Sequence, residues 1–426
     1  MERSINMLSR LRRVVAPGGF LGNPFIRVIL VSNLFLQIGI WIRNFAVLLF
    51  VMEKTNNDSV AVSWLYVAEF TPILVFSVIG GAFADRWRPK KTMVICDLLS
   101  ALSIFLILLA LAGASWKAIF FTTFLSAILS QFSQPSGMKL FKQHVPEDQL
   151  QTGMALYQAT ISIFMIGGPA IGTLVFKSYG IYVSIALVGI CFLISAALLL
   201  RLPADRSVEK NKQEANIWLE LRDGFRYVVK RPILRLMGIA FGLGGIAVGL
   251  TQSLGIFIVV DRLHLDKEFY QWFAVVNVVA MVVGGAFVVG VSKKITPQVI
   301  LAIGNLFCAI TSIAIGLTTL LFWSLFFHFI RGFVLPFVQV GINTIVLKAS
   351  EEAFVGRVNG IFGPIYMGML VLMTSLSGWL NTFIPLAGMF IFSGIVFLVA
   401  TGIISLMFRI KLSETRDTGA ASSMSA

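Results

Sequence analysis

The 426-residue chain is 57% hydrophobic and 13% charged, with a mean hydropathy of +0.88. Soluble domains carry about 25% charged residues, so this composition excludes a water-soluble fold and predicts an all-α membrane protein. The net charge of +14 would also fit a nucleic-acid-binding protein, but the placement of the basic residues argues against that class.

Apolar runs divide the chain into two sets of six. A basic N-terminal segment (1–24) precedes the first bundle (25–200), with runs near 25–52, 61–84, 92–113, 117–141, 152–176 and 179–200. A polar linker (201–231) precedes the second bundle (232–409), with runs near 233–260, 269–291, 297–318, 321–347, 356–380 and 384–408, and a polar tail (410–426). Each run can cross a hydrocarbon core of roughly 30 Å as a helix. We therefore predict twelve transmembrane helices in two six-helix bundles.

The basic residues gather on one side of these runs. The N-terminal segment, the linker, the tail and every second loop hold 27 lysines and arginines, against 5 in the alternate loops. The positive-inside rule then predicts a multi-pass cell-membrane protein, bacterial in type, with both termini and the linker in the cytoplasm. The charge is thus explained by topology, without nucleic acid.

The linker contains apolar residues at helical spacing. Trp218, Leu221, Phe225 and Val228 or Val229 recur with charges between them, and Pro232 ends the pattern. This pattern predicts an amphipathic helix along the cytoplasmic membrane interface. A docking helix for a protein partner is the alternative.

The second half of the chain repeats the first at one offset. "GGAF" begins at position 80 and again at 284, and "GMKLFKQHVPEDQL" begins at Gly137 where "GINTIVLKASEEAF" begins at Gly341. Both pairs are separated by 204 positions. Such a duplication predicts pseudo-symmetric bundles, and transporters built from repeats bind substrate between the repeats.

The turn between the second and third runs carries a charged motif. Its sequence "GGAFADRWRPKK" resembles the cytoplasmic motif of the major facilitator superfamily, G-x-L-a-D-R-x-G-R-K-x. The matching residues are Gly81, Phe83, Ala84, Asp85, Arg86 and Lys90; Arg88 and Pro89 stand where the family has its inner glycine and arginine. The resemblance implies that Asp85 latches against the eleventh span in the outward-facing state. The repeat has Val289 at this position, so we interpret Asp85 as a one-sided switch, and we expect Asp97, just inside the third span, to stabilise the basic cluster.

Two further stretches resemble one branch of that superfamily. "ELRDGFRYVVKRPILRLM" (220–237) is similar to the entry into the seventh span of the drug and siderophore exporters, including the macrolide efflux and enterobactin exporter types. In the fifth span, Gly168, Pro169 and Gly172 match the core of the family's antiporter motif, although Phe164 replaces an upstream glycine. The resemblance implies export of amphipathic small molecules by alternating access.

Charges inside apolar runs mark candidate sites, because a charge at mid-membrane costs roughly 2.5–3.5 kcal/mol on insertion scales. Arg43 and Glu69 are equally distant from position 56 in the first external loop. An antiparallel helix hairpin would place them at similar depth, so we predict an ion pair. One interpretation is a structural clamp between helices one and two; the other is that Glu69 is a protonatable coupling site that responds to Arg43.

Polar residues on two helices predict a substrate cavity. Asn33, Gln37, Trp41 and Asn44 share an arc of the first helix, and Arg43 lies off that arc with small residues on its own face. In the tenth span, His328, Arg331, Leu335, Gln339 and Asn343 fall on one side. Arg331 has Ala127 as its repeat counterpart, so we expect it to attract an anionic or catecholate-like group or to hold a cavity carboxylate. The aromatic residues we expect in the cavity are Trp41, Tyr66 and Phe337.

The remaining motifs limit the function classes. No phosphate-binding GxxxxGK[ST] loop occurs, so we expect no ATP and no cofactor, with a proton gradient as the energy source. No histidine and acidic cluster suits a metal or an intramembrane hydrolase, and the three cysteines stand alone in apolar runs. We therefore predict a monomeric, proton-coupled exporter of small molecules rather than an enzyme. The alternatives are a lipid or lysolipid flippase and a non-transporting receptor or scaffold.

Overall fold

The computed structural model describes residues 24–113, 116–145, 147–203, 217–292, 294–351 and 354–410. It describes the backbone but not the side chains of residues 24, 77–86, 142, 147–152, 155 and 217–221. Within these ranges the regular elements are helices, without strands.

The described residues of the first half form five long helices. They are α2 (Pro24–Lys54), α3 (Ser59–Arg86), α4 (Pro89–Ala112), α5 (Ala118–His144) and α6 (Glu147–Leu200). The 54-residue α6 is two membrane-length helices joined at Gly180, whose φ of +70° is readily adopted only by glycine. It therefore covers two of the predicted runs.

The second half begins with α7 (Ile217–Lys230) and continues through α8 (Pro232–Gln252). A short α9 (Gly255–Phe257), a π-helical turn η2 (Ile258–Arg262) and a 3-10 turn η3 (Lys267–Phe269) lead into α10. The remaining elements are α10 (Tyr270–Val291), α11 (Pro297–Leu317), α12 (Leu321–Ala349), α13 (Val355–Leu380), α14 (Leu386–Leu406) and η5 (Met407–Arg409).

These helices confirm the predicted all-α membrane fold. Each of the twelve apolar runs contains one long helix or one half of α6, and the run near 233–260 also contains α9 and part of η2. Ten of the described helices are long and apolar enough to cross a membrane; α6 counts once among them, and α5, with several serine, glutamine and lysine residues, is not included. Proline begins α4, α8 and α11, where its fixed φ suits the first turn. Pro89, a departure from the family motif, thus has a helix-starting role.

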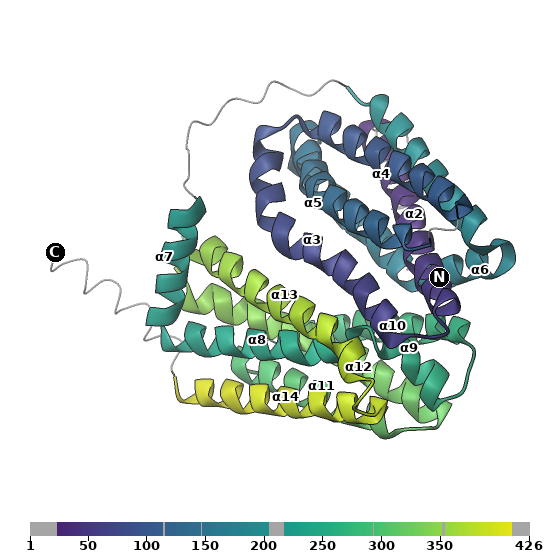
Figure 1. The fold of residues 1–426 in the computed structure, drawn as a ribbon. Helices are drawn as coiled ribbons and strands as arrows, with labels where there is room; N and C mark the ends of the chain where they lie inside the picture. Colours follow the sequence, from purple (N-terminus) through teal and green to yellow (C-terminus); the bar gives the residue numbers. More distant parts are fainter. Residues whose placement is uncertain are drawn as a thin grey trace, which may run out of the picture. The chain divides into compact units, whose positions relative to one another are not determined.

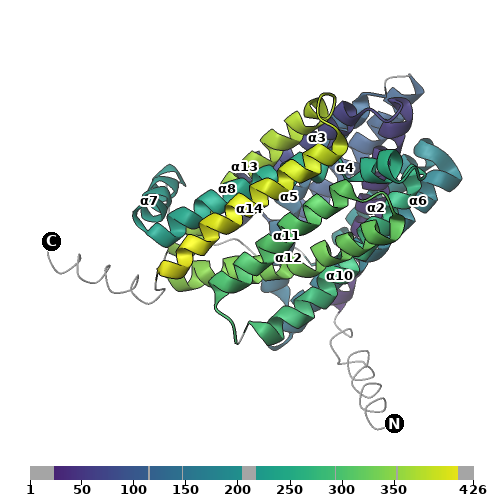
Figure 2. The same cartoon turned by 90° about the horizontal axis from the view of Figure 1, so that it is seen from below.

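The chain forms two compact units. The first comprises Met1–Phe50 and Thr71–Asn211, and the second Val51–Phe70 and Lys212–Ala426. In the first unit α4 packs on α5 and α6. In the second, each helix contacts the next in the order α13, α8, α14, α11, α12 and α10, and α7 crosses the ends of α8 and α13 (Figures 1 and 2).

The second unit includes the hairpin tip between α2 and α3. The Ser59 hydroxyl donates to the Gly378 carbonyl oxygen (3.1 Å), and Ser63 shares hydrogen bonds with Ser253 (2.9 Å) and Ser377 (3.3 Å). Ser253 and Ser377 are also bonded to each other (2.9 Å). A buried triangle of hydroxyls therefore joins α3 to α13 and the end of α8.

Glycines allow the closest helix contacts within the units. A Cβ on Gly284, in the second "GGAF", would lie 1.9 Å from the Phe333 carbonyl oxygen, and one on Gly332 would lie 2.2 Å from that of Asn277. These two glycines therefore let the backbones of α10 and α12 touch, which is the usual role of small residues between membrane helices.

Candidate functional site

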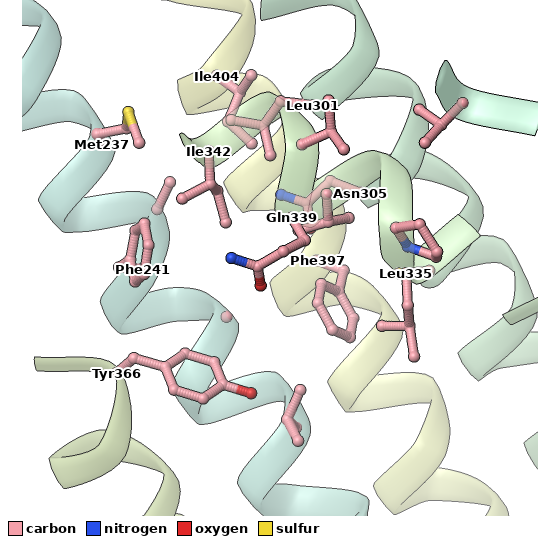
Figure 3. Close-up of a pocket in the computed structure, with 18 of the residues that line it drawn as sticks. Met237, Phe241, Leu301, Asn305, Leu335, Gln339, Ile342, Tyr366, Phe397 and Ile404 are labelled. Atoms are coloured by element: carbon pink, nitrogen blue, oxygen red, sulfur yellow. The ribbon is translucent and has the colours of Figure 1, made fainter. Parts of the chain in front are cut away.

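A cavity of about 630 Å³ lies within the second unit. Its wall comes from α8, α10, α11, α12, α13 and α14, and is mainly aliphatic and aromatic (Figure 3). The volume falls in the range of roughly 300–1,000 Å³ that holds small organic ligands. The cavity can therefore take an apolar body of drug-like size.

A few neutral polar groups interrupt this wall. Gln339 of α12 projects its amide between Phe241 and Phe397, and the Tyr366 hydroxyl points into the same space (Figure 3). Asn305 of α11 is the third polar group. The Gln339 amide nitrogen donates to the Asn343 side-chain oxygen at 3.1 Å, which orients the amide at the cavity wall. Such groups fix a ligand's orientation by hydrogen bonds without imposing a charge.

Arg331 places a cation next to this wall. It precedes Leu335, which lines the cavity, by one helical turn. Its charge acts on two lining residues, Cys308 and Tyr366, and on Tyr270. Within the described part of the chain, the guanidinium makes no ion pair or hydrogen bond. Arg331 is therefore a cation one helical turn from the cavity wall, and its contact with an anionic group stays a prediction.

His328, predicted on the same face as Arg331, packs against neighbouring protein groups. Its Nδ1 lies 2.8 Å from the Ser324 carbonyl oxygen. Its ring meets the Phe273 ring edge-on at 4.8 Å. These contacts hold the imidazole against its own helix and α10.

Two predicted cavity aromatics lie away from this space. Phe337 is buried against Val288 and Ile300, in contact with α10 and α11. It projects from the opposite side of α12 to Gln339, so it fills the core where a cavity position was expected. Tyr66 stacks on Phe70, with ring centroids 5.9 Å apart, and lies beside Tyr270.

Sequence reasoning missed Tyr366 and Asn305. Both stand singly in apolar helices, α13 and α11, that were not considered as cavity walls. Their polar groups were a signal in the sequence, because a polar side chain inside a membrane helix needs an explanation, as a charge does. Only the packing order of the helices shows that the two residues share a space.

The predicted arc of α2 has two buried and two half-buried residues, all in the first unit. Asn33 and Gln37 are 3% and 8% exposed, and both side-chain polar atoms of Asn33 lack a partner among the described residues. Trp41 packs on Gly168, where a Cβ would lie 2.3 Å from the indole Cγ. A Cβ on Gly172 would lie 2.6 Å from the Trp41 carbonyl oxygen. Gly168 and Gly172 thus let α2 and α6 approach closely.

Arg43 is held by neutral oxygens. Its guanidinium donates to the Ser126 hydroxyl of α5 and to the Asn44 side-chain oxygen at 2.9 and 3.2 Å. These contacts connect α2 to α5, so the clamp between helices one and two stays a prediction. The ion pair with Glu69 stays a prediction.

The charged turn is described in part. Gly81, Asp85 and Arg86 are described by their backbone alone, so the latch that the resemblance implies stays a prediction. Lys90 donates to the carbonyl oxygens of Leu200 (3.0 Å) and Leu202, which ties the start of α4 to the end of α6.

Asp97 has a different partner from the expected basic cluster. Its carboxylate accepts a hydrogen bond from the Ser195 hydroxyl of α6 at 2.6 Å. Packing of α4 on α6 turns this side chain into the bundle, away from the turn.

Comparisons with known proteins agree with this architecture. The chain is 24% identical over 344 residues to YkuC, an uncharacterised MFS-type transporter of Bacillus subtilis (strain 168), covering 78% of this chain and 79% of YkuC. It is 23% identical over 334 residues to the multidrug efflux pump Tap of Mycolicibacterium fortuitum, covering 73% and 78%. The solved nucleoside transporter NupG shares the fold, with a TM-score of 0.73, 15% identity and coverage of 91% and 100%.

The family assignment rests on most of the chain. The sequence pattern of the Major Facilitator Superfamily matches residues 29–370, and NupG, which shares the fold, is a transporter. The chain therefore belongs to the major facilitator superfamily and is a membrane-embedded transporter.

Proposed function

We propose that this transporter is a secondary active exporter of amphipathic small molecules. The cavity of the second unit carries this proposal, because it combines an apolar wall with three neutral hydrogen-bonding groups, Gln339, Asn305 and Tyr366. This wall suits lipophilic drugs or a siderophore-like molecule better than a fully polar metabolite. Arg331 adds a positive charge at the edge for substrates with an anionic group.

The direction and the energy source rest on other observations. Tap, which is similar along most of the chain, is a multidrug efflux pump. The sequence lacks a phosphate-binding loop, which favours a proton gradient over ATP as the driving force. Glu69, with Arg43 as its charge partner, is the coupling candidate from the sequence.

A transport assay in liposomes tests the proposed proton-coupled export. Purified protein is reconstituted into liposomes, and the liposomes are loaded with fluorescent amphipathic dyes. A pH gradient is then imposed with or without an uncoupler. We expect dye movement that follows the gradient and stops with the uncoupler. A gradient-independent signal for wild type would contradict proton coupling, and movement of labelled lysolipid in place of dye would favour the flippase.

Two glycines on α10 provide a matched pair of variants. A Cβ on Gly285, which lines the cavity, meets only Pro336 at 4.0 Å, so Gly285→Leu fills free space. Gly290 is also unobstructed but does not line the cavity, so Gly290→Leu is the control. We expect Gly285→Leu to weaken dye binding at least tenfold, with Gly290→Leu close to wild type. Equal binding in both variants would exclude this cavity as the substrate site.

A further inference from the structure

A buried carboxyl group occupies the interior of the first unit. Asp97 of α4 is 3% exposed, and its carboxylate accepts a hydrogen bond from Ser195 of α6 at 2.6 Å. The Ser195 hydroxyl is also 2.9 Å from that of Ser32 on α2. A chain of one carboxyl and two hydroxyls therefore crosses three helices, and all three residues are at most 3% exposed.

The ion pairs of the described residues do not include Asp97. Lys90, on the same helix, donates to the carbonyl oxygens of Leu200 and Leu202. Lys139 of α5 donates to the Trp87 carbonyl oxygen at 3.4 Å. Within the described residues, Asp97 therefore has no ion pair with a lysine or arginine.

Two neutral titratable groups face Asp97. Tyr157 of α6 and Cys96 of α4 lie close enough to interact with its charge. On α2, the polar group of this hydrogen-bonded series is the Ser32 hydroxyl, which does not titrate. The surroundings of Asp97 thus contain hydroxyl and thiol groups, which carry no charge at neutral pH.

A hydroxyl partner suits a group that changes its protonation state. The Ser195 hydroxyl can donate to a carboxylate and can accept from a carboxylic acid. The hydrogen bond can therefore persist in both states, whereas an arginine partner would strongly favour the carboxylate alone.

The internal repeat indicates that this acid is not needed for packing. Position 301 is the repeat counterpart of position 97, because 301 − 97 = 204 and the repeated stretches on both sides share this offset. Leu301 stands there, 3% exposed, in the corresponding helix of the second bundle. The fold thus accommodates a buried leucine where the first bundle has an acid.

We propose that Asp97 is a proton-binding site of the transport cycle, in addition to the candidate Glu69. This inference rests on the proposed proton coupling. The Asp97 carboxylate takes up one proton to form an O–H bond and later releases it, and Ser195 reverses its hydrogen bond in each step. The proton comes from water on one side of the membrane and leaves to the other, so no further reactant is needed.

Asp97→Asn separates proton binding from structure. Asparagine keeps an oxygen that accepts the Ser195 hydrogen bond but cannot bind a proton. We expect this variant to lose gradient-driven dye transport at least tenfold while it retains dye exchange without a gradient. If Asp97 only connects helices, Asp97→Asn will couple as well as wild type, and the proposal is overturned.

Two further variants keep the test decisive if Asp97→Asn loses all transport activity. Asp97→Glu keeps a carboxyl group, one methylene farther from the backbone, and Ser195→Ala removes the hydrogen bond while leaving Asp97 intact. We expect Asp97→Glu to regain coupling, and Ser195→Ala to shift the midpoint of the transport pH profile, since a hydroxyl that bonds the carboxylate stabilises that form. If Asp97→Asn abolishes exchange and Asp97→Glu restores neither activity, Asp97 has a packing role.

Wild-type transport distinguishes the two failures. If wild type moves dye without any dependence on the pH gradient, the proposed function fails and the inference fails with it. If wild type is gradient-driven and Asp97→Asn is unchanged, only the inference fails. Glu69→Gln in the same assay shows whether the two acids contribute separately.

Discussion

Charged residues inside the helices of this transporter have three kinds of environment. Arg43 binds neutral side-chain oxygens, Asp97 binds a serine hydroxyl, and Arg331 makes no ion pair or hydrogen bond within the described residues. Because insertion of each charge costs roughly 2.5–3.5 kcal/mol, the residue without a partner is the strongest candidate for a ligand contact. Arg331 is therefore the residue of the three that we propose to contact substrate.

Replacing Arg331 with alanine should weaken the binding of anionic dyes selectively. A hydrogen bond to a charged group contributes about 1.5–3 kcal/mol, so we expect a loss of tenfold or more. Binding of a neutral dye with the same ring system should change little. Fluorescence titration of purified protein measures both dyes, and an equal loss for the two would mean that Arg331 supports the fold.

The glycines of the antiporter-type motif should be intolerant of a methyl group. A Cβ on Gly172 would meet the Trp41 carbonyl oxygen at 2.6 Å and the Phe45 Cβ at 2.8 Å. Overpacking of this kind costs about 1–3 kcal/mol, so Gly172→Ala should lower the melting temperature in detergent. Gly167, where a Cβ has no neighbour within 4 Å, provides the control. A Gly167→Ala melting temperature as low as that of Gly172→Ala would contradict the α2–α6 explanation.

The linker helix α7 is attached by a face that apolar periodicity did not identify. Tyr227 stacks on Phe354 with ring centroids 4.1 Å apart, and a Cβ on Gly224 would lie 3.1 Å from that of Arg357. Val228 is buried, whereas Phe225 is 57% exposed and Val229 44%. Trp218 and Leu221 have side chains outside the described residues. Glycine, tyrosine and arginine form the contact, so a search for large apolar residues finds the helix but not its docked face.

Arg231 should be the main tie of α7. Its guanidinium lies 4.3 Å from the centre of the Tyr227 ring, donates to the Ala349 carbonyl oxygen at 2.9 Å and pairs with Glu351. Arg231→Ala removes all three contacts, so we expect faster protease cleavage of the linker and a lower melting temperature. Arg226→Ala, at an exposed position of the same helix, should match wild type. Equal cleavage of both variants would show that α7 is held by other contacts.

At the scale of the molecule, the sequence predicted the number and extent of the helices because each apolar run must match the membrane thickness. It did not predict that Val51–Phe70 belongs with the second unit. The contacts of this segment include Ser63, Ser253 and Ser377, small hydroxyl residues that have no periodic signal. Similarly, Phe337 and Gln339 are two positions apart on α12, and only the neighbouring helices decide which one faces the cavity. The partners of a side chain can thus be predicted only when the positions of the helices around its own helix are known.

Orientation in the membrane is the last property that the charge pattern predicts. The 27 to 5 bias of lysine and arginine places Lys348 in the cytoplasm and the loop that contains Phe383 outside. Cys96, Cys191 and Cys308 are all buried, so an introduced cysteine at an exposed position should label above a low background. We expect a membrane-impermeant maleimide to label Phe383→Cys in intact cells, and Lys348→Cys only after permeabilisation. Because every basic segment contributes to the same orientation, the reverse labelling pattern would contradict the topology as a whole, including the cytoplasmic position of α7.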